Sequence, residues 1–122
     1  MFEISVSMDF SAAHNLRNYQ GKCERLHGHN WQVEVTFGSE KLDKSNMVMD
    51  FSQAKKMLKQ VLAYFDHSYI NETEYFKKFN PTSENIAKFI FEKLKSEAKK
   101  MDCDVMRVNV WETPRSKATY YE

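Results

Sequence analysis

Two stretches of this chain alternate strictly between apolar and polar residues. The apolar positions are Phe2, Ile4, Val6, Met8 and Phe10 in the first stretch, and Trp31, Val33, Val35 and Phe37 in the second. A period of two predicts β-strands that each bury one face. The intervening segment is rich in asparagine and glycine, which predicts a long connection between two antiparallel strands.

The period changes after Asp50. Apolar residues recur at helical spacing from Phe51 to Phe65, and Asp50 is placed to cap the helix that they predict. A polar loop is expected over residues 66–80. A second helix is expected from its N-cap Thr82 to about Lys100, followed by strands over 105–112 and 117–121 with a turn between them.

The expected order of elements is β-β-α-α-β-β, in one domain over residues 1–122. This order predicts an α+β fold in which a four-stranded, mostly antiparallel sheet carries both helices on one face. Such a sheet leaves its edge strands unpaired. Because unpaired edges are usually covered in proteins, we expect the chain to oligomerise through its sheet.

Composition excludes several classes of protein. The chain has 122 residues, 42% hydrophobic and 14% aromatic, which supports a packed core rather than disorder. Lys+Arg total 18 and Asp+Glu 17, so we expect no nucleic-acid or anionic-membrane partner. No apolar run approaches the roughly 20 residues of a membrane span, and the N-terminus does not resemble a signal peptide. We therefore expect a cytoplasmic protein in which Cys23 and Cys103 are free thiols.

Three of the four histidines fall on the apolar faces of the first two strands. When the second strand is extended backwards, His29 and His27 are in phase with Trp31, with Cβ atoms about 6–7 Å apart. His14 is in phase with Phe10 if no bulge intervenes. An antiparallel pair would bring the three imidazoles together, and three neutral imidazoles with an open fourth position are typical of catalytic zinc sites.

Two alternatives to a catalytic zinc site stay open from the spacing alone. The histidines could be ordinary polar residues near a loop. They could also form a closed structural zinc site with Cys23, which lies four residues before His27.

His67 directly follows Asp66 at the end of the first expected helix. The adjacent carboxylate could hold one imidazole tautomer, or favour the imidazolium form. The alternative is a histidine that is favoured by the helix dipole at a C-terminus.

Glu112 ends the third expected strand. It shares its phase with three apolar residues, Met106, Val108 and Val110. A carboxylate at the end of an apolar face requires a partner, because a buried unpaired charge is costly. A ligand with paired N–H donors would supply one. The alternative is that Glu112 faces solvent.

These residues resemble motifs of the 6-pyruvoyltetrahydropterin synthase family. The similar segments are C-x-x-x-H-G-H (Cys23, His27 and His29), SAAHNL around His14, FDHSYIN around Asp66 and His67, and WETP around Glu112; MVMDF at 47–51 and NPTSENIA at 80–87 resemble the starts of the two helices. The short chain and the NPTSENIA segment look most like the bacterial branch, the 6-carboxy-5,6,7,8-tetrahydropterin synthases of the queuosine (7-deazaguanine) pathway. A folate-type branch carries glutamate where Cys23 stands.

The resemblance implies the tunnelling fold (T-fold). Three β-β-α-α-β-β subunits would join their sheets into a barrel, and two trimers would stack into a homohexamer. Zn²⁺ would be held by His14, His27 and His29. Active sites would lie between subunits, with Cys23 on one chain and the Asp66–His67 pair on another.

The implied substrate is 7,8-dihydroneopterin triphosphate. Cys23 would act as proton acceptor, Asp66 would orient His67, and Glu112 would anchor the pterin. Within the NPTSENIA segment, Thr82 and Glu84 would contact the substrate. The reaction releases triphosphate and, in the carboxypterin branch, cleaves the side chain to acetaldehyde. Two rival hypotheses remain: triphosphate elimination alone, giving 6-pyruvoyltetrahydropterin, and a non-catalytic zinc- or pterin-binding module.

Overall fold

The structure is a computed structural model that describes all residues, Met1–Glu122. β1 (Phe2–His14) and β2 (His27–Ser39) form an antiparallel pair. Its register runs without a shift from the Phe2–Ser39 pair to the His14–His27 pair. The alternation therefore continues in phase along the pair, although Phe2 at its end is exposed, and the expected phase of the three histidines is confirmed.

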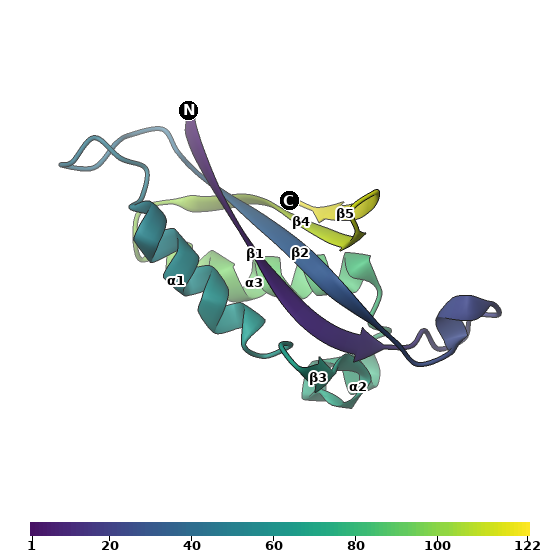
Figure 1. Cartoon of the computed structure of the whole chain (residues 1–122). Helices are drawn as coiled ribbons and strands as arrows, with labels where there is room; N and C mark the ends of the chain where they lie inside the picture. The colour runs from purple at the N-terminus through teal and green to yellow at the C-terminus, as the bar shows by residue number, and fades with distance from the viewer.

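The sheet has five strands in the order β3-β1-β2-β4-β5 (Figure 1). β4 (Asp104–Thr113) and β5 (Ser116–Tyr120) continue the antiparallel pattern, whereas β3 (Ser68–Tyr69) pairs parallel to β1. The expectation of four strands thus missed β3, and the sheet is mixed. A strand of two residues is too short to show any period, which is why the sequence gives no sign of it.

Two long helices pack on one face of the sheet, as expected (Figure 1). α1 (Phe51–Leu62) begins after Asp50, whose carboxylate accepts a hydrogen bond from the Ser52 amide at 2.7 Å. α3 (Ser83–Lys99) begins after Thr82, whose hydroxyl accepts one from the Asn85 amide at 3.1 Å. Both predicted N-caps are confirmed. None of the helices has the length and apolar character needed to cross a membrane.

The expectation of a plain polar loop over residues 66–80 is wrong. This segment contains β3, the 3₁₀ turn η2 (Ile70–Glu72) and the short helix α2 (Glu74–Lys78). Ile70 and Phe76 are fully buried in the core. The hydrophobic anchors are too widely spaced among polar residues to produce a helical or strand period.

Two register shifts change which way side chains of β4 point. The shift opposite Thr36 and Phe37 pairs Val105 with Phe37, so Val105 enters the core and Met106 is only partly buried. The prediction that Met106 shares the buried face of β4 with Val108 and Val110 is therefore wrong. The second shift lies between Trp111 and Thr113, at Glu112. Bulges of this kind commonly re-aim a side chain beside a functional site.

The second face of the sheet carries no helix (Figure 1). It is polar: Ser5 bonds Thr36 at 2.7 Å, and the buried side chain of Asn109 donates to Glu34 at 3.0 Å. β1 is paired on its outer side only at Ala12 and Ala13, and β5 is the opposite edge. The chain thus has an open sheet with two incompletely paired edges. Cys23 and Cys103 are both free, as predicted.

Candidate metal centre

Four potential ligands meet at one end of the sheet: His14, His27, His29 and Glu112. Their ligating atoms all lie within 4.8 Å of one another. His14 is the last residue of β1, while His27 and His29 open β2 directly beside it. The structure thus brings together the three histidines that the sequence predicts as metal ligands, and it adds Glu112 from β4 to them.

Trp31 forms the floor of this cluster. Its side chain is fully buried, and its ring lies edge-on to His14 at 4.8 Å and to His29 at 5.2 Å between centroids. On its other side Trp31 stacks on Phe10 at 5.7 Å. Close packing of this kind restricts the rotation of both imidazoles, so the cluster is held on a rigid base.

Two backbone carbonyls determine where the histidine protons lie. The Nδ1 atom of His14 is 2.8 Å from the Pro81 carbonyl oxygen, and the Nδ1 atom of His27 is 2.6 Å from that of Arg25. A carbonyl oxygen only accepts hydrogen bonds, so each Nδ1 must carry the proton. In a neutral imidazole the other nitrogen, Nε2, then has a free lone pair.

The two free lone pairs face each other. The Nε2 atoms of His14 and His27 are 3.0 Å apart. With both protons held at Nδ1, neither nitrogen can donate to the other. Two such lone pairs repel at this distance, unless a cation lies between them and accepts both.

His29 has a buried nitrogen without a hydrogen bond. Its Nε2 atom has no hydrogen-bond partner, although it lies 3.1 Å from Oε1 of Glu112. This proximity lacks the direction that a hydrogen bond requires, so we interpret it as a non-bonded approach. Buried polar atoms without partners are rare in folded proteins. A metal ion would satisfy this atom.

Burial also favours the neutral form of these side chains. Burial lowers the pKa of His14, against an opposing effect from the Pro81 carbonyl, and burial likewise lowers the pKa of His29, against that of the Glu112 carboxylate. A lowered pKa keeps the imidazole neutral at neutral pH. Neutral imidazole is the form that binds metal ions.

The donor set suits zinc. Zn–N bonds of 2.0–2.1 Å in a tetrahedron place neighbouring ligand atoms roughly 3.3 Å apart, and the close pairs here are 3.0–3.1 Å apart. The carbonyls of Pro81 and Arg25 are the kind of outer partner that orients histidine ligands. The four side chains could therefore hold a divalent metal ion.

Cys23 lies outside this cluster. It is half-buried in the 3₁₀ turn η1 (Lys22–Glu24), and it is not among the side chains that converge on the common point. Its carbonyl accepts a hydrogen bond from the Leu16 amide at 2.8 Å, which ties the turn to the end of β1. The closed Cys-His-His-His site is therefore not formed, and Glu112 rather than Cys23 is the fourth potential ligand of the cluster.

Asp66 and His67 do not join the cluster of their own chain. The Asp66 carboxylate accepts a hydrogen bond from the Ser11 amide at 3.0 Å and lies 3.7 Å from His67. The His67 side chain is 84% exposed, and its φ of 56° is left-handed. It borders a hollow of 410 Å³ together with Ser11 and Asn30, and His29 of the cluster borders the same hollow.

The remaining candidates lie near the centre without entering it. The Thr82 hydroxyl is used as the N-cap of α3, and Glu84 is exposed on its first turn. The group that reaches the cluster from this segment is the carbonyl of Pro81. No side-chain motif could have pointed to it, because the contact is made by the backbone.

Two asparagines that the sequence analysis missed hold the segment after His14. The Asn71 side chain accepts from the Asn15 amide at 3.0 Å and donates to the Asn15 carbonyl at 2.9 Å. Asn80 makes the same pair of bonds to Arg17, at 2.9 and 3.0 Å. Each side-chain amide thus makes the two backbone hydrogen bonds that a neighbouring strand would make, and it holds the backbone beside the cluster in place.

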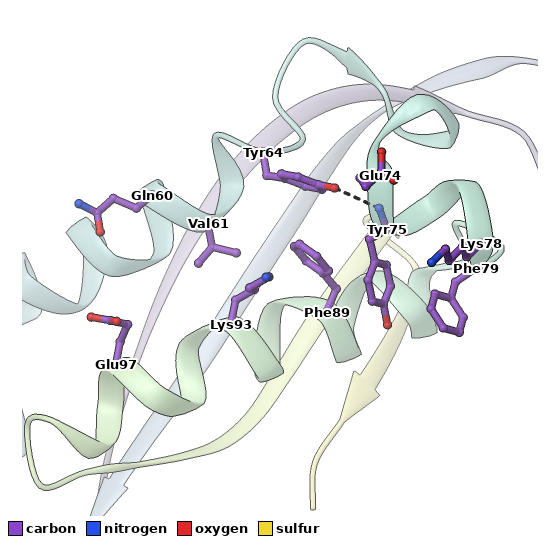
Figure 2. A pocket seen from close by; sticks show the side chains of 10 residues that line it. All are labelled: Gln60, Val61, Tyr64, Glu74, Tyr75, Lys78, Phe79, Phe89, Lys93 and Glu97. Carbon is purple, nitrogen blue, oxygen red and sulfur yellow. Dashed lines mark hydrogen bonds between the residues drawn. The ribbon is translucent and has the colours of Figure 1, made fainter.

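A larger hollow lies on the helical side of the molecule (Figure 2). It measures 680 Å³ and is bordered by residues of α1, α2 and α3. Aromatic rings dominate it: Tyr64 stacks on Phe89 at 4.9 Å, and its hydroxyl accepts a hydrogen bond from the Tyr75 amide at 3.3 Å. It contains none of the four potential ligands and no histidine or cysteine. The potential metal ligands therefore lie outside this hollow.

The cluster generates a prediction about metal content. Purified protein should contain about one zinc ion per chain, and His27→Ala or His29→Ala should lose it, because each variant removes a converging lone pair. The matched control is His67→Ala, which should keep its zinc. Elemental analysis measures the ratio. Full zinc occupancy in a His14→Ala, His27→Ala, His29→Ala triple variant would show that the ion binds elsewhere.

The chain is similar along its length to known proteins. The profile of the family described as 6-pyruvoyl tetrahydropterin synthase matches residues 3–122. The 6-carboxy-5,6,7,8-tetrahydropterin synthase of Haemophilus influenzae is 34% identical over 100% of this chain and 100% of that protein. The enzyme of the same name from Synechocystis is 37% identical, covering 99% of this chain and 94% of its own.

The fold is shared as well. A solved structure of Caenorhabditis elegans 6-pyruvoyl tetrahydropterin synthase matches with a TM-score of 0.88 and 34% sequence identity, covering 99% of this chain and 95% of that one. The α+β architecture is thus that of a tunnelling-fold subunit, as predicted. Together, the matched profile, the relatives and the fold show that this chain belongs to the 6-pyruvoyl tetrahydropterin synthase family.

Proposed function

We propose that this chain is a zinc-dependent carbon–carbon lyase of queuosine biosynthesis. It converts 7,8-dihydroneopterin triphosphate to 6-carboxy-5,6,7,8-tetrahydropterin and releases acetaldehyde and triphosphate. The observation that carries the proposal is the convergence of three histidines, two of them with Nε2 left unprotonated by carbonyl contacts. Similarity over the whole chain to proteins named 6-carboxy-5,6,7,8-tetrahydropterin synthase supports the product. The proposal implies a cytoplasmic enzyme with a small-molecule partner.

His14, His27 and His29 would hold the zinc ion, which when bound supplies Lewis acidity to oxygens of the substrate side chain. The protein's own contribution is rigidity. The floor formed by Trp31 and the two carbonyl bonds hold the ligands in place before substrate arrives. Preorganised groups of this kind need no rearrangement during the reaction.

Glu112 would anchor the pterin. A carboxylate can accept two parallel hydrogen bonds from a planar donor edge, and the amino group and adjacent ring N–H of a pterin form such an edge. The Glu112 side chain is 29% exposed beside the histidines, so a ligand can reach it. Thr82 and Glu84, at the start of α3, are proposed as further substrate contacts on the resemblance alone.

Cys23 would accept a proton from the substrate. The thiolate rather than the thiol is the effective base, and nearby cationic groups or a metal ion stabilise a thiolate. We propose that the Asp66–His67 pair of a neighbouring subunit provides part of this environment. The exposure of His67 and its strained backbone conformation support a role in which it meets another chain.

The open sheet supports such an assembly. We propose that subunits join edge to edge, with β1 and β5 as the strands that pair, and that the resulting barrels stack as a hexamer. Each subunit has incompletely paired edges on both sides of its sheet. Edge strands of this length are rarely left uncovered in stable proteins.

A second candidate is favoured by the likeness to the C. elegans enzyme, which is named for the 6-pyruvoyl product. This reaction would use the same zinc and pterin contacts and would stop after triphosphate elimination. Triphosphate is released in both reactions, so product analysis decides between acetaldehyde with a 6-carboxypterin and a 6-pyruvoylpterin without acetaldehyde.

The first functional prediction concerns chemistry. With 7,8-dihydroneopterin triphosphate, the wild-type protein should release acetaldehyde and a 6-carboxypterin, detected by chromatography and mass spectrometry. Cys23→Ala should keep zinc and pterin affinity and lose turnover by about 10²–10⁴-fold, the usual contribution of a positioned acid–base group. Loss of zinc in this variant would make Cys23 a ligand. An unchanged rate would show that Cys23 is not the proton acceptor, whereas a wild-type protein that binds pterin without turnover would support a non-catalytic binding module.

The second functional prediction concerns assembly. Light scattering should show a hexamer, or at least a trimer. Cys23→Ala and His67→Ala should each lose most of their turnover alone, and subunits mixed by co-expression should regain activity, because some shared sites then contain both intact groups. A fully active monomer, or mixed assemblies with no recovered activity, would contradict sites shared between chains.

A further inference from the structure

The aromatic hollow on the helical side of the molecule has no part in the proposed reaction. Its volume of 680 Å³ lies within the range of protein pockets that bind small molecules. Residues of all three α-helices border it (Figure 2). The assembly proposed above joins the edges of the sheet, so the helical layer that contains this hollow would stay open to solvent.

Four aromatic rings form the apolar part of the hollow. Tyr64 stacks on Phe89 with ring centroids 4.9 Å apart, and Tyr75 stacks on Phe79 at 4.7 Å. The two stacked pairs meet edge-on, because the ring of Tyr75 lies 4.9 Å from that of Phe89. Tyr64 and Phe79 are nevertheless 39% and 49% exposed. Partly exposed rings beside a hollow offer surfaces on which a planar aromatic ligand can stack.

Both glutamates that border the hollow are paired with lysines outside it. The Glu74 carboxylate lies 3.7 Å from the ammonium group of Lys77, and the Glu97 carboxylate lies 3.1 Å from that of Lys100. Exposed pairs of this kind contribute little to stability. They do, however, offset the two negative charges at the rim of the hollow.

The two lysines that border the hollow have no carboxylate partner. Neither Lys78 nor Lys93 forms an ion pair. The Nζ atom of Lys93 lies 5.3 Å from the centroid of the Phe89 ring, so its ammonium group sits beside the aromatic wall (Figure 2). Attraction to a ring face leaves the three N–H donors of an ammonium group free for other partners. The hollow thus combines aromatic surfaces with two cations that lack an anion.

We propose that this hollow is a second ligand site, separate from the histidine cluster, and that it binds a small planar aromatic carboxylate. The ring of the ligand would stack on the exposed aromatic wall, and its carboxylate would pair with Lys93. Lys78 would add to the attraction for an anion. A neutral ligand would leave both cations without a partner, and a non-planar anion would leave the rings exposed. The inference goes beyond the proposed function, because it involves neither the metal ion nor the substrate.

2-Naphthoate is the probe, because it joins a carboxylate to two fused aromatic rings and has no N–H donors for a pterin anchor. Purified wild-type protein should bind it saturably, with the roughly millimolar or tighter affinity expected of a ligand of this size. 2-Naphthamide keeps the rings without the charge, and cyclohexanecarboxylate keeps the charge without the rings. Each should bind at least about tenfold more weakly, because it lacks one of the two interactions. Naphthoate fluorescence measures binding, and the other two ligands are measured by competition.

Lys93→Gln tests the residue that would hold the carboxylate. This variant should bind 2-naphthoate about tenfold more weakly, the usual effect of losing a hydrogen bond between charged groups. Lys88→Gln is the matched control, because Lys88 lies on the same helix, outside the hollow, 4.0 Å from Glu92. It should bind as wild type does. His27→Ala should also bind normally, which separates the hollow from a carboxylate site on the metal ion.

Several results would overturn the proposal. One is the absence of saturable binding of 2-naphthoate to wild-type protein up to about 5 mM, well above the dissociation constant expected. Another is equal affinity in Lys93→Gln and Lys88→Gln, and a third is loss of binding in folded His27→Ala, which would place the ligand at the histidine cluster. Equal affinity for all three ligands would also contradict it, and that comparison needs only wild-type protein. No measurement requires turnover, so failure of the proposed function would leave this test unaffected.

Discussion

The hydrogen bond between His14 and the Pro81 carbonyl connects the parts of this molecule on which its chemistry depends. Pro81 directly precedes the N-cap of α3, and His14 is the last residue of β1. The bond at 2.8 Å therefore joins the helical layer to the end of the sheet. It also fixes the proton on Nδ1, which leaves Nε2 free to bind a cation. One backbone acceptor thus sets both the position and the tautomer of the most buried histidine.

Other contacts fix the remaining parts of the histidine cluster in a similar way. The unbroken β1–β2 register places His27 opposite His14, and the Arg25 carbonyl fixes its proton in the same way. Asn71 and Asn80 hold the chain after His14 with paired side-chain bonds. These contacts come from segments that are far apart in sequence and meet only in the folded chain. A preformed cluster of this kind loses little entropy when it binds an ion.

Much of this arrangement could be predicted from the sequence, because the alternation of apolar and polar residues shows which side chains share a face of the sheet. The period-two pattern predicted that His14, His27 and His29 share the buried side, and the unshifted register confirms it. Asp50 and Thr82 were recognisable as N-caps because their side chains perform the capping. In each case the residue type itself provides the interaction.

Other features could not be predicted, because they depend on the backbone or on bulges. The carbonyls of Pro81 and Arg25 have no side-chain signature, and β3 is too short to show a period. The shift at Thr36 and Phe37 reversed the expected phase at Met106. Resemblance to a family drew attention to Glu112 as a pterin contact, whereas its approach to two imidazoles is visible only in three dimensions.

The central claim is that the histidine cluster is built to present unprotonated Nε2 atoms to a cation. Long-range ¹H–¹⁵N NMR of chelator-treated protein at neutral pH measures this directly, because it distinguishes the two neutral tautomers and the imidazolium form. The account predicts that His14 and His27 each carry a proton on Nδ1 and none on Nε2. A proton on Nε2 of either residue in the folded, metal-free protein would contradict it.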